Sequence, residues 1–292
     1  MSDVVEAPAA TGPPLGRSQP AAIPIAHRLA GLVTAPVVEV LLAPRCWITG
    51  AALRARDGGL AADVRNGIAA GMEQSYCRRC GLTLGLFVTG DYANPCGRCA
   101  TRDLGVQRLA RVGAFDHPLR DLVLRMKYGR RFELAGILGT FLGRTLVREI
   151  PAQEIAETVL APIPLYFWRR FWRGFNQAEE LACVAGKVAD VPVVDAVARR
   201  RHTRAQALTD SAAARKENLR NAFIAIAHRA IVGKHLWLVD DVCTTGATLF
   251  WATRALRRLP MELRPKSINA AVLCVADKPG DAAVAPLALP GR

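Results

Sequence analysis

The residues best suited to chemistry lie in one stretch, LWLVDDVCTTGAT, at positions 236–248. Four apolar residues lead into two adjacent carboxylates, Asp240 and Asp241, and paired carboxylates suit a sugar diol or a divalent cation. The turn that follows offers backbone N–H groups and threonine hydroxyls, which bind phosphate. The residues of this turn are Thr244, Thr245, Gly246, Ala247 and Thr248. The stretch therefore indicates a site for a phosphorylated sugar; the alternative is a plain strand–turn–helix in which the aspartates only cap.

The pattern around this stretch predicts how it is held. The apolar run 236–239 is short and ends in turn residues, as a buried strand does. A helix is expected over 247–259, capped by Thr245 and followed by Pro260. The two carboxylates would then lie at the carboxyl end of a strand and against a helix N-terminus, where open α/β sheets bind ligands.

This loop resembles the phosphoribosyl-pyrophosphate loop of type I phosphoribosyltransferases. The resemblance implies that Asp240 and Asp241 are the catalytic carboxylates and hold the ribose hydroxyls. It implies also that residues 244–248 wrap the 5′-phosphate of a donor that is bound with Mg²⁺. A P-loop is excluded, because no Gly-Lys-Ser/Thr sequence follows.

Four cysteines form the second constellation. Two CxxC pairs are separated by fifteen residues, and this spacing fits a four-thiolate zinc site. The four residues are Cys77, Cys80, Cys96 and Cys99. A site with four sulfurs is closed to substrate, so the zinc would be structural. Redox-active CxxC pairs are the alternative, but two pairs within so short a segment favour a metal.

A second loop is the candidate for the pyrophosphate end of the donor. A buried strand is expected over 158–164, and a parallel strand would end at the same sheet edge as the aspartates. The loop after it carries guanidinium groups, which bind phosphate bidentately, and two amides. These candidates are Arg169, Arg170, Arg173, Asn176 and Gln177. Aromatic residues interleave with them, so the loop could instead stack on bases of single-stranded nucleic acid, pack a helix on the sheet, or be an ordinary solvated basic loop.

Composition sets the remaining bounds. The 292 residues allow about two domains, and strands alternating with helices predict an α/β fold with a mostly parallel sheet and flanking helices. The net charge of +14 points to anionic partners such as phosphates, nucleic acid or a membrane surface. No apolar run reaches the ~18 residues of a membrane span, and no secretory signal is recognisable. We therefore expect a soluble, cytoplasmic protein that does not span the membrane.

Taken in order, the motifs resemble those of the ComF family, which comprises competence-associated, phosphoribosyltransferase-like bacterial proteins. The motifs are the four-cysteine ribbon, MKYGRR, PIP followed by RGFNQAEELA, an R…Q…R…N…F stretch and LVDDVCTTGATL. The resemblance covers about residues 44–275. It implies a type I phosphoribosyltransferase-like domain at 106–276, preceded by a helix and zinc ribbon at 28–105. Residues 1–27 and 277–292 are expected to be a disordered tail and a flexible tail.

The resemblance implies a role in DNA uptake, in which the protein binds phosphoribosyl pyrophosphate, engages single-stranded DNA and works with a competence helicase or another uptake-machinery protein. It leaves open whether a phosphoribosyl group is transferred, and to which acceptor. The main alternative is a true phosphoribosyltransferase of nucleotide metabolism, and a weaker one is a donor-binding regulator that docks a partner through the ribbon. One departure from the family pattern is that Cys46 is followed by Trp47, Ile48 and Thr49 rather than by a second cysteine.

Overall fold

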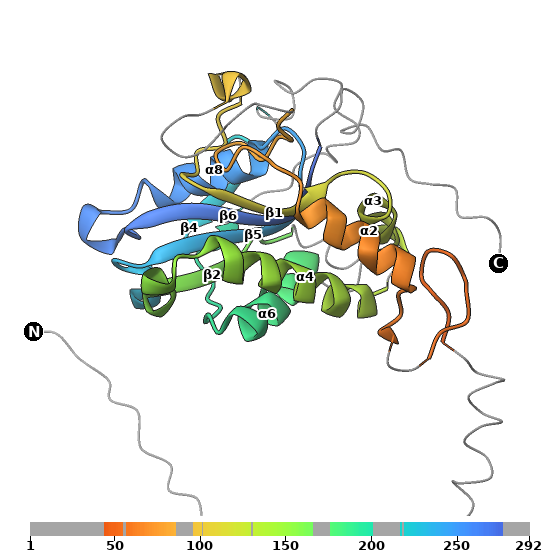
Figure 1. Ribbon diagram of the computed structural model, residues 1–292. Coiled ribbons are helices and arrows are strands. Elements are labelled where there is room, and N and C mark those ends of the chain that lie inside the picture. The colour runs from red at the N-terminus through yellow and green to blue at the C-terminus, as the bar shows by residue number, and fades with distance from the viewer. Residues whose placement is uncertain are drawn as a thin grey trace, which may run out of the picture. The chain divides into compact units, whose positions relative to one another are not determined.

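Four parallel strands form the central sheet, as the alternation of strands and helices predicts. Their order is β1 (Leu109–Ala114), β6 (Ser267–Val275), β5 (His235–Cys243) and β2 (Thr158–Pro162) (Figure 1). The computed structural model describes residues 44–54, 57–85, 96–100, 102–129, 131–165, 176–200, 217 and 219–276. Those from Arg45 onward belong to one compact unit.

The strands are apolar runs that the fold buries on both faces. All nine residues of β6 and all five of β2 are buried, as expected for a parallel sheet covered on both sides. Strand β5 is longer than the predicted run 236–239, because its pairing with β6 continues through Asp240↔Val272 and Val242↔Cys274. Backbone pairing therefore extends β5 through Asp240 and Asp241. The end of the strand that hydropathy predicted, residue 239, is too early.

One face of the sheet is covered by four helices. They are α2 (Ala62–Met72), α3 (Leu119–Tyr128), α4 (Glu133–Glu149) and α6 (Gln177–Ala189) (Figure 1). Trp237 and Val239 of β5 are buried in this layer. Helices α4 and α6 lie in close contact because Gly139 leaves room for Val184; a Cβ at Gly139 would come within 2.7 Å of the valine.

The opposite face carries a different layer. It contains α8 (Ala247–Leu256), the cysteine segment and a two-stranded antiparallel ribbon of β3 (Val197–Arg199) and β4 (Phe223–Ala225). Leu236 and Leu238 alternate with Trp237 and Val239 along β5 and point into this second core. Short 3-10 turns occupy Gly97–Ala100, Ala152–Glu157, Arg229–Ile231 and Met261–Leu263.

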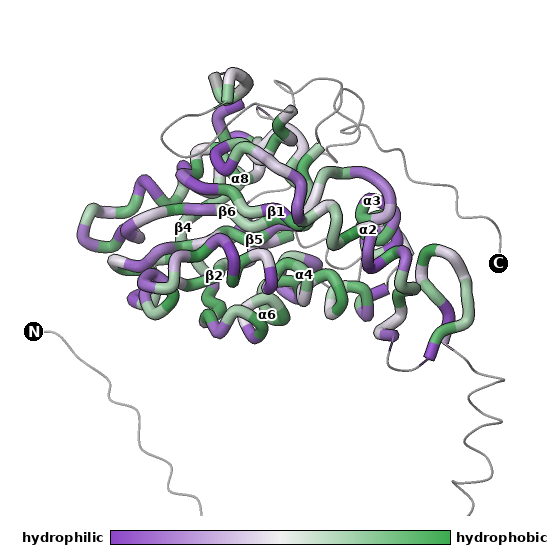
Figure 2. The backbone as a smooth tube through the Cα atoms, viewed as in Figure 1, coloured by the Kyte–Doolittle hydropathy of each residue, from purple (hydrophilic) through white to green (hydrophobic). Residues whose placement is uncertain are grey.

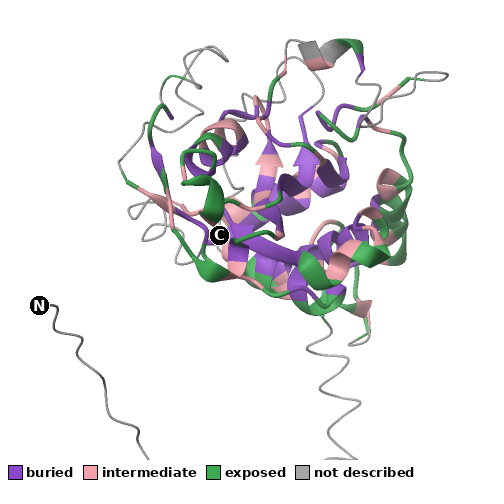
Figure 3. Cartoon of the chain, turned by 90° about the vertical axis from the view of Figure 1, so that its left-hand side faces the viewer, coloured by how far each residue is buried: buried purple, intermediate pink, exposed green. Residues whose placement is uncertain are grey.

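Polar and exposed residues are distributed around this core. Figure 2 shows hydrophilic segments gathered at the end of the sheet where β5 and β6 begin, and Figure 3 shows buried strands and inner helix faces surrounded by exposed outer turns. Among the described helices, none is both long and apolar enough to cross a bilayer. The helix expected at the start of the segment 28–105 and both predicted tails lie outside the described residues.

Candidate functional site

The loop that carries the predicted donor site lies at the carboxyl end of β5. Asp240 and Asp241 lie near the carboxyl end of β5, which ends at Cys243. Residues 244–246 connect the strand to α8. The backbone N–H of Asp241 donates to the carboxylate of Asp240 at 2.8 Å. The first bond of α8 runs from the N–H of Phe250 to the carbonyl of Gly246. The amides of the first helical turn precede that bond, and helix geometry directs them outward, where an anion can accept from them.

Gly246, rather than the predicted Thr245, is the capping residue of α8. Its φ of +77° lies in the left-handed region, which favours glycine. A Cβ at this position would clash with the side chain of Leu104. Thr245 Oγ1 accepts a long hydrogen bond, 3.4 Å, from the N–H of Ala247, the first residue of α8. The prediction that Thr245 is the capping residue was therefore wrong by one position, although its hydroxyl does contact the start of the helix.

The electrostatic environment of the acidic pair disfavours two negative charges. Burial and the neighbouring carboxylate of Asp241 raise the pKa of Asp240 to about 7. Lys127 offsets this in part, since its Nζ contacts Asp241 Oδ1 at 2.8 Å. Lys127 comes from the last turn of α3, and the sequence identified it only as part of the MKYGRR motif. The site thus contains two carboxylates and an ammonium group, a set that can bind sugar hydroxyls and a cation.

Arg102 joins the cysteine segment to residues 244–248, the predicted phosphate-binding loop (hereafter the phosphate loop). Its Nη2 donates to the carbonyls of Thr244 (2.6 Å) and Cys243 (3.3 Å), and its Nη1 donates to the carbonyl of Ala276 (3.3 Å). Its own backbone N–H donates to the carbonyl of Cys99 at 3.3 Å. A guanidinium that holds several carbonyls fixes their relative positions. No motif in the sequence indicated this residue.

The four predicted metal ligands come together in space. The Sγ atoms of Cys77, Cys80, Cys96 and Cys99 all lie within 4.8 Å of one another. The 77–99 and 80–96 sulfurs are 3.6 Å apart, and the 96–99 sulfurs are 3.8 Å apart. Sulfurs bound tetrahedrally at ~2.3 Å from zinc are about 3.8 Å from each other. The cluster therefore has the dimensions of a closed four-thiolate site and could hold a metal such as zinc.

A buried arginine holds the first CxxC pair against the sheet. Arg111 of β1 is 1% exposed and donates to the carbonyl of Gly81 at 2.6 Å and to Thr83 Oγ1 at 2.7 Å. Gly81 has φ +77°, as the tight turn after Cys80 requires. Arg111 and Arg102 thus attach the cysteine segment to β1 and to the phosphate loop respectively.

Comparison with known proteins shows the family to which this chain belongs. The chain is 30% identical over 207 residues to "Competence protein F" of Haemophilus influenzae, covering 68% of this chain and 87% of that protein. It is 31% identical over 216 residues to "DNA utilization protein YhgH" of Escherichia coli, covering 73% of this chain and 90% of that protein. The chain belongs to the ComF family. No family model matches it.

Cys46 lies in a turn that repeats the geometry of the intact CxxC turn of this ComF-family chain. The N–H of Cys46 donates to the carbonyl five residues on, and the N–H of Gly50 donates back to Cys46. Cys77 and Gly81 make the same two bonds, and Gly50 shares the positive φ. Thr49 stands where the second cysteine of such a pair would be. This chain therefore keeps the backbone turn of a CxxC pair at residues 46–50, but Thr49 replaces the second cysteine of the pattern.

The arginines proposed for pyrophosphate, Arg169, Arg170 and Arg173, lie outside the described residues. Asn176 and Gln177 are described and are buried, at 7% and 1% exposure, where α6 begins. Because α6 follows β2, which pairs in parallel with β5, this position lies toward the sheet edge that carries Asp240 and Asp241. Their contact with a pyrophosphate stays a prediction.

Proposed function

We propose that this ComF-family chain binds phosphoribosyl pyrophosphate with Mg²⁺ at the loop 240–248 and acts in the uptake or handling of single-stranded DNA. The observation that supports the donor site is the placement of Asp240 and Asp241 directly before a left-handed Gly246 and the start of α8. The proposal includes a type I phosphoribosyltransferase-like fold for the sheet and its helices. The DNA role is supported by relatives named for competence and for DNA utilization.

Each group of the site has a role in this proposal. The carboxylates accept hydrogen bonds from the ribose hydroxyls, and the amides and hydroxyls of residues 244–248 donate to the 5′-phosphate. Mg²⁺ would be held by the carboxylates together with the donor's oxygens and would neutralise charge on pyrophosphate. Lys127 holds the carboxylate of Asp241 through their ion pair at 2.8 Å. Arg102 keeps the Thr244 carbonyl turned inward, so the loop amides face outward.

The cysteine cluster has a structural role in the proposal. Burial and hydrogen bonding with neighbouring thiols raise the pKa of Cys80 and Cys99, in the second case to about 11. Such thiols are held as thiolates by a bound cation, which Cys77, Cys80, Cys96 and Cys99 would ligate. The bound metal would hold the two CxxC turns together and thereby position Arg102 and Leu104 against the phosphate loop.

Calorimetric titration with phosphoribosyl pyrophosphate and Mg²⁺ tests the donor site. The wild type is expected to bind, and Asp240→Asn/Asp241→Asn is expected to lose at least tenfold in affinity. Asp63→Asn, an exposed aspartate on α2, is the matched control and should bind as the wild type does. Absence of binding by the wild type would refute the donor site and leave a nucleic-acid or partner-binding protein.

Pyrophosphate release separates the two functional classes. A true phosphoribosyltransferase of nucleotide metabolism would release pyrophosphate when a base or amine acceptor is added. The proposed DNA-handling protein would bind the donor without such release, and would bind single-stranded DNA. Parallel assays with bases, amines and single-stranded DNA as additions therefore distinguish a metabolic transferase from a donor-binding competence protein.

A further inference from the structure

A pocket lies at the opposite end of the sheet from the phosphate loop. His235 and Ser267 begin β5 and β6 and form part of its lining. Because β5 is nine residues long, the two ends of the sheet are roughly 26 Å apart. The pocket has a volume of about 630 Å³, which is in the range of pockets that bind small ligands. It is therefore distinct from the proposed donor site.

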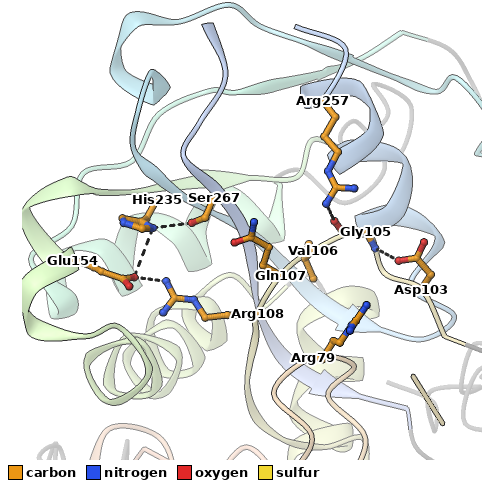
Figure 4. A pocket seen from close by; sticks show the side chains of 10 residues that line it. All are labelled: Arg79, Asp103, Gly105, Val106, Gln107, Arg108, Glu154, His235, Arg257 and Ser267. Atoms are coloured by element: carbon orange, nitrogen blue, oxygen red, sulfur yellow. Dashed lines mark hydrogen bonds and ion pairs between the residues drawn. The ribbon is translucent and has the colours of Figure 1, made fainter. Parts of the chain in front are cut away.

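The floor of the pocket is a fixed polar network (Figure 4). His235 Nδ1 lies 2.8 Å from Ser267 Oγ, and Arg108 pairs with Glu154 and donates to Asn269 Oδ1 at 3.3 Å. Burial lowers the pKa of His235, which favours the neutral imidazole. The three side chains Ser267, His235 and Glu154 do not form a hydrolytic triad, since the serine and the carboxylate both approach Nδ1. The geometry favours binding over catalysis.

The walls of the pocket carry exposed arginines. Arg79 comes from the intact CxxC turn between Cys77 and Cys80, and Arg257 follows α8 (Figure 4). Within the described segments, no hydrogen bond or ion pair involves the side chain of Arg79. Arg257 donates to the carbonyl of Gly105 at 2.7 Å, and the carboxylate of Asp103 accepts from the N–H of the same glycine at 2.8 Å.

The charge of this pocket favours an anion. Three arginines and two acidic residues line it, which leaves one net positive charge. Glu154 is neutralised by Arg108. The remaining charges are those of Arg79, Arg257 and the exposed carboxylate of Asp103, whose Oδ1 accepts from the N–H of Gly105. The chain beyond Arg257 adds the exposed arginines Arg258 and Arg264, whereas Lys266 is paired with Glu157 at 3.2 Å. Additional positive charge of this kind favours a polyanion over a single small anion.

We propose that this pocket binds a phosphate group of single-stranded DNA, with Arg79 and Arg257 as the two contacting cations. The inference rests on the proposed DNA role and gives it a location. None of the described lining residues is aromatic, so the contact is to the sugar–phosphate backbone and is independent of base sequence. Because Arg79 stands between two cysteines of the metal cluster, the ribbon itself presents a DNA contact, and its position depends on the metal.

Fluorescence anisotropy with a labelled oligo-deoxythymidine tests this. Arg79→Glu/Arg257→Glu is expected to weaken binding at least tenfold, and the neutral Arg79→Gln/Arg257→Gln less. Each phosphate contacted on a single strand contributes about 0.7 to the slope of log K against log salt. Because both arginines contact one phosphate group, the neutral double variant should flatten that slope by about 0.7. Arg54→Glu is the control and should change affinity less than twofold. Arg54 is exposed and follows Leu53, which packs on the core formed with α2, α3, α4 and α6.

Metal content and thermal melting of every variant establish that the ribbon is intact. Wild-type binding that survives unchanged in both double variants would overturn the pocket assignment while leaving the DNA role in place. Absence of oligonucleotide binding by the metal-loaded wild type would overturn the DNA role, and the pocket proposal with it. Weakening by Arg54→Glu equal to that of the pocket variants would show that general positive charge, rather than this pocket, binds the DNA.

Discussion

At the level of single residues, the ionised carboxylate of Asp240 lowers the free energy of unfolding. Its pKa is raised to about 7 by burial and by Asp241, whereas an unfolded aspartate titrates near pH ~3.9. Between these values the folded state binds more protons than the unfolded state, so this group lowers stability as the pH rises through that window. A carboxylate whose ionisation lowers stability in this way is typical of a binding site at a strand end, and it does not stabilise the core.

Asp240→Asn should therefore stabilise the protein, and more so in alkali. The amide keeps the shape of the carboxylate and removes the buried charge. Because part of the cost is already relieved by protonation in acid, the gain in stability at pH 8 should be roughly two to three times that at pH 5. Thermal melts at both pH values measure this, and a gain that does not change with pH would show that Asp240 titrates normally.

Lys127, in contrast to Asp240, is expected to stabilise the folded protein. Its ion pair with Asp241 is largely sheltered, with side-chain exposures of 17% and 13%. Lys127→Met should cost about 1–3 kcal/mol of unfolding free energy, because it leaves a carboxylate unpaired beside another. Adding Asp241→Asn should restore most of that loss, and denaturant unfolding of the single and double variants measures the coupling. Strictly additive effects would mean that the contact contributes nothing.

At the level of elements, the phosphate loop is held by a segment distant in sequence. Arg102 contacts the carbonyl of Thr244 across 142 residues. Arg102→Ala should increase hydrogen exchange at the amides of residues 243–248 and weaken donor binding, with the metal retained. Arg45→Ala is a matched control, since Arg45 donates to the carbonyl of Gly50 in the Cys46 turn at 3.0 Å. Unchanged exchange in the loop of Arg102→Ala would contradict a positioning role.

These elements show what sequence patterns could and could not predict. The start of β2 and the four-cysteine cluster were predicted correctly, because a short apolar run and CxxC spacing are local signals. The end of β5 and the cap of α8 were wrong, because strand pairing and the close approach of Leu104 to Gly246 decide them. Lys127 and Arg102 were not placed at the site, since only the folded topology brings them there.

At the level of the whole molecule, the ribbon and the sheet share one core. Cys77, Cys80 and Cys96 are buried in the same hydrophobic cluster as Leu236, Leu238 and other residues of β5, β6 and α8. The described residues from Arg45 onward belong to one compact unit. We therefore expect the metal site to stabilise the sheet domain as well as the ribbon, although the sequence motifs suggest a boundary near residue 105.

Cysteine substitution tests this coupling. Cys96→Ser should abolish metal binding, and it should lower the melting temperature of the whole unit by roughly 10 °C or more in a single transition, because bound metal contributes to folding. Cys183→Ser is the control: this cysteine is exposed on α6 and outside the cluster, so metal content and melting should stay as in the wild type. Calorimetry with metal analysis measures both. Two separate transitions in the wild type, with only the first lost in Cys96→Ser, would mean that the ribbon folds independently and that the shared core does not transmit its stability to the phosphate loop.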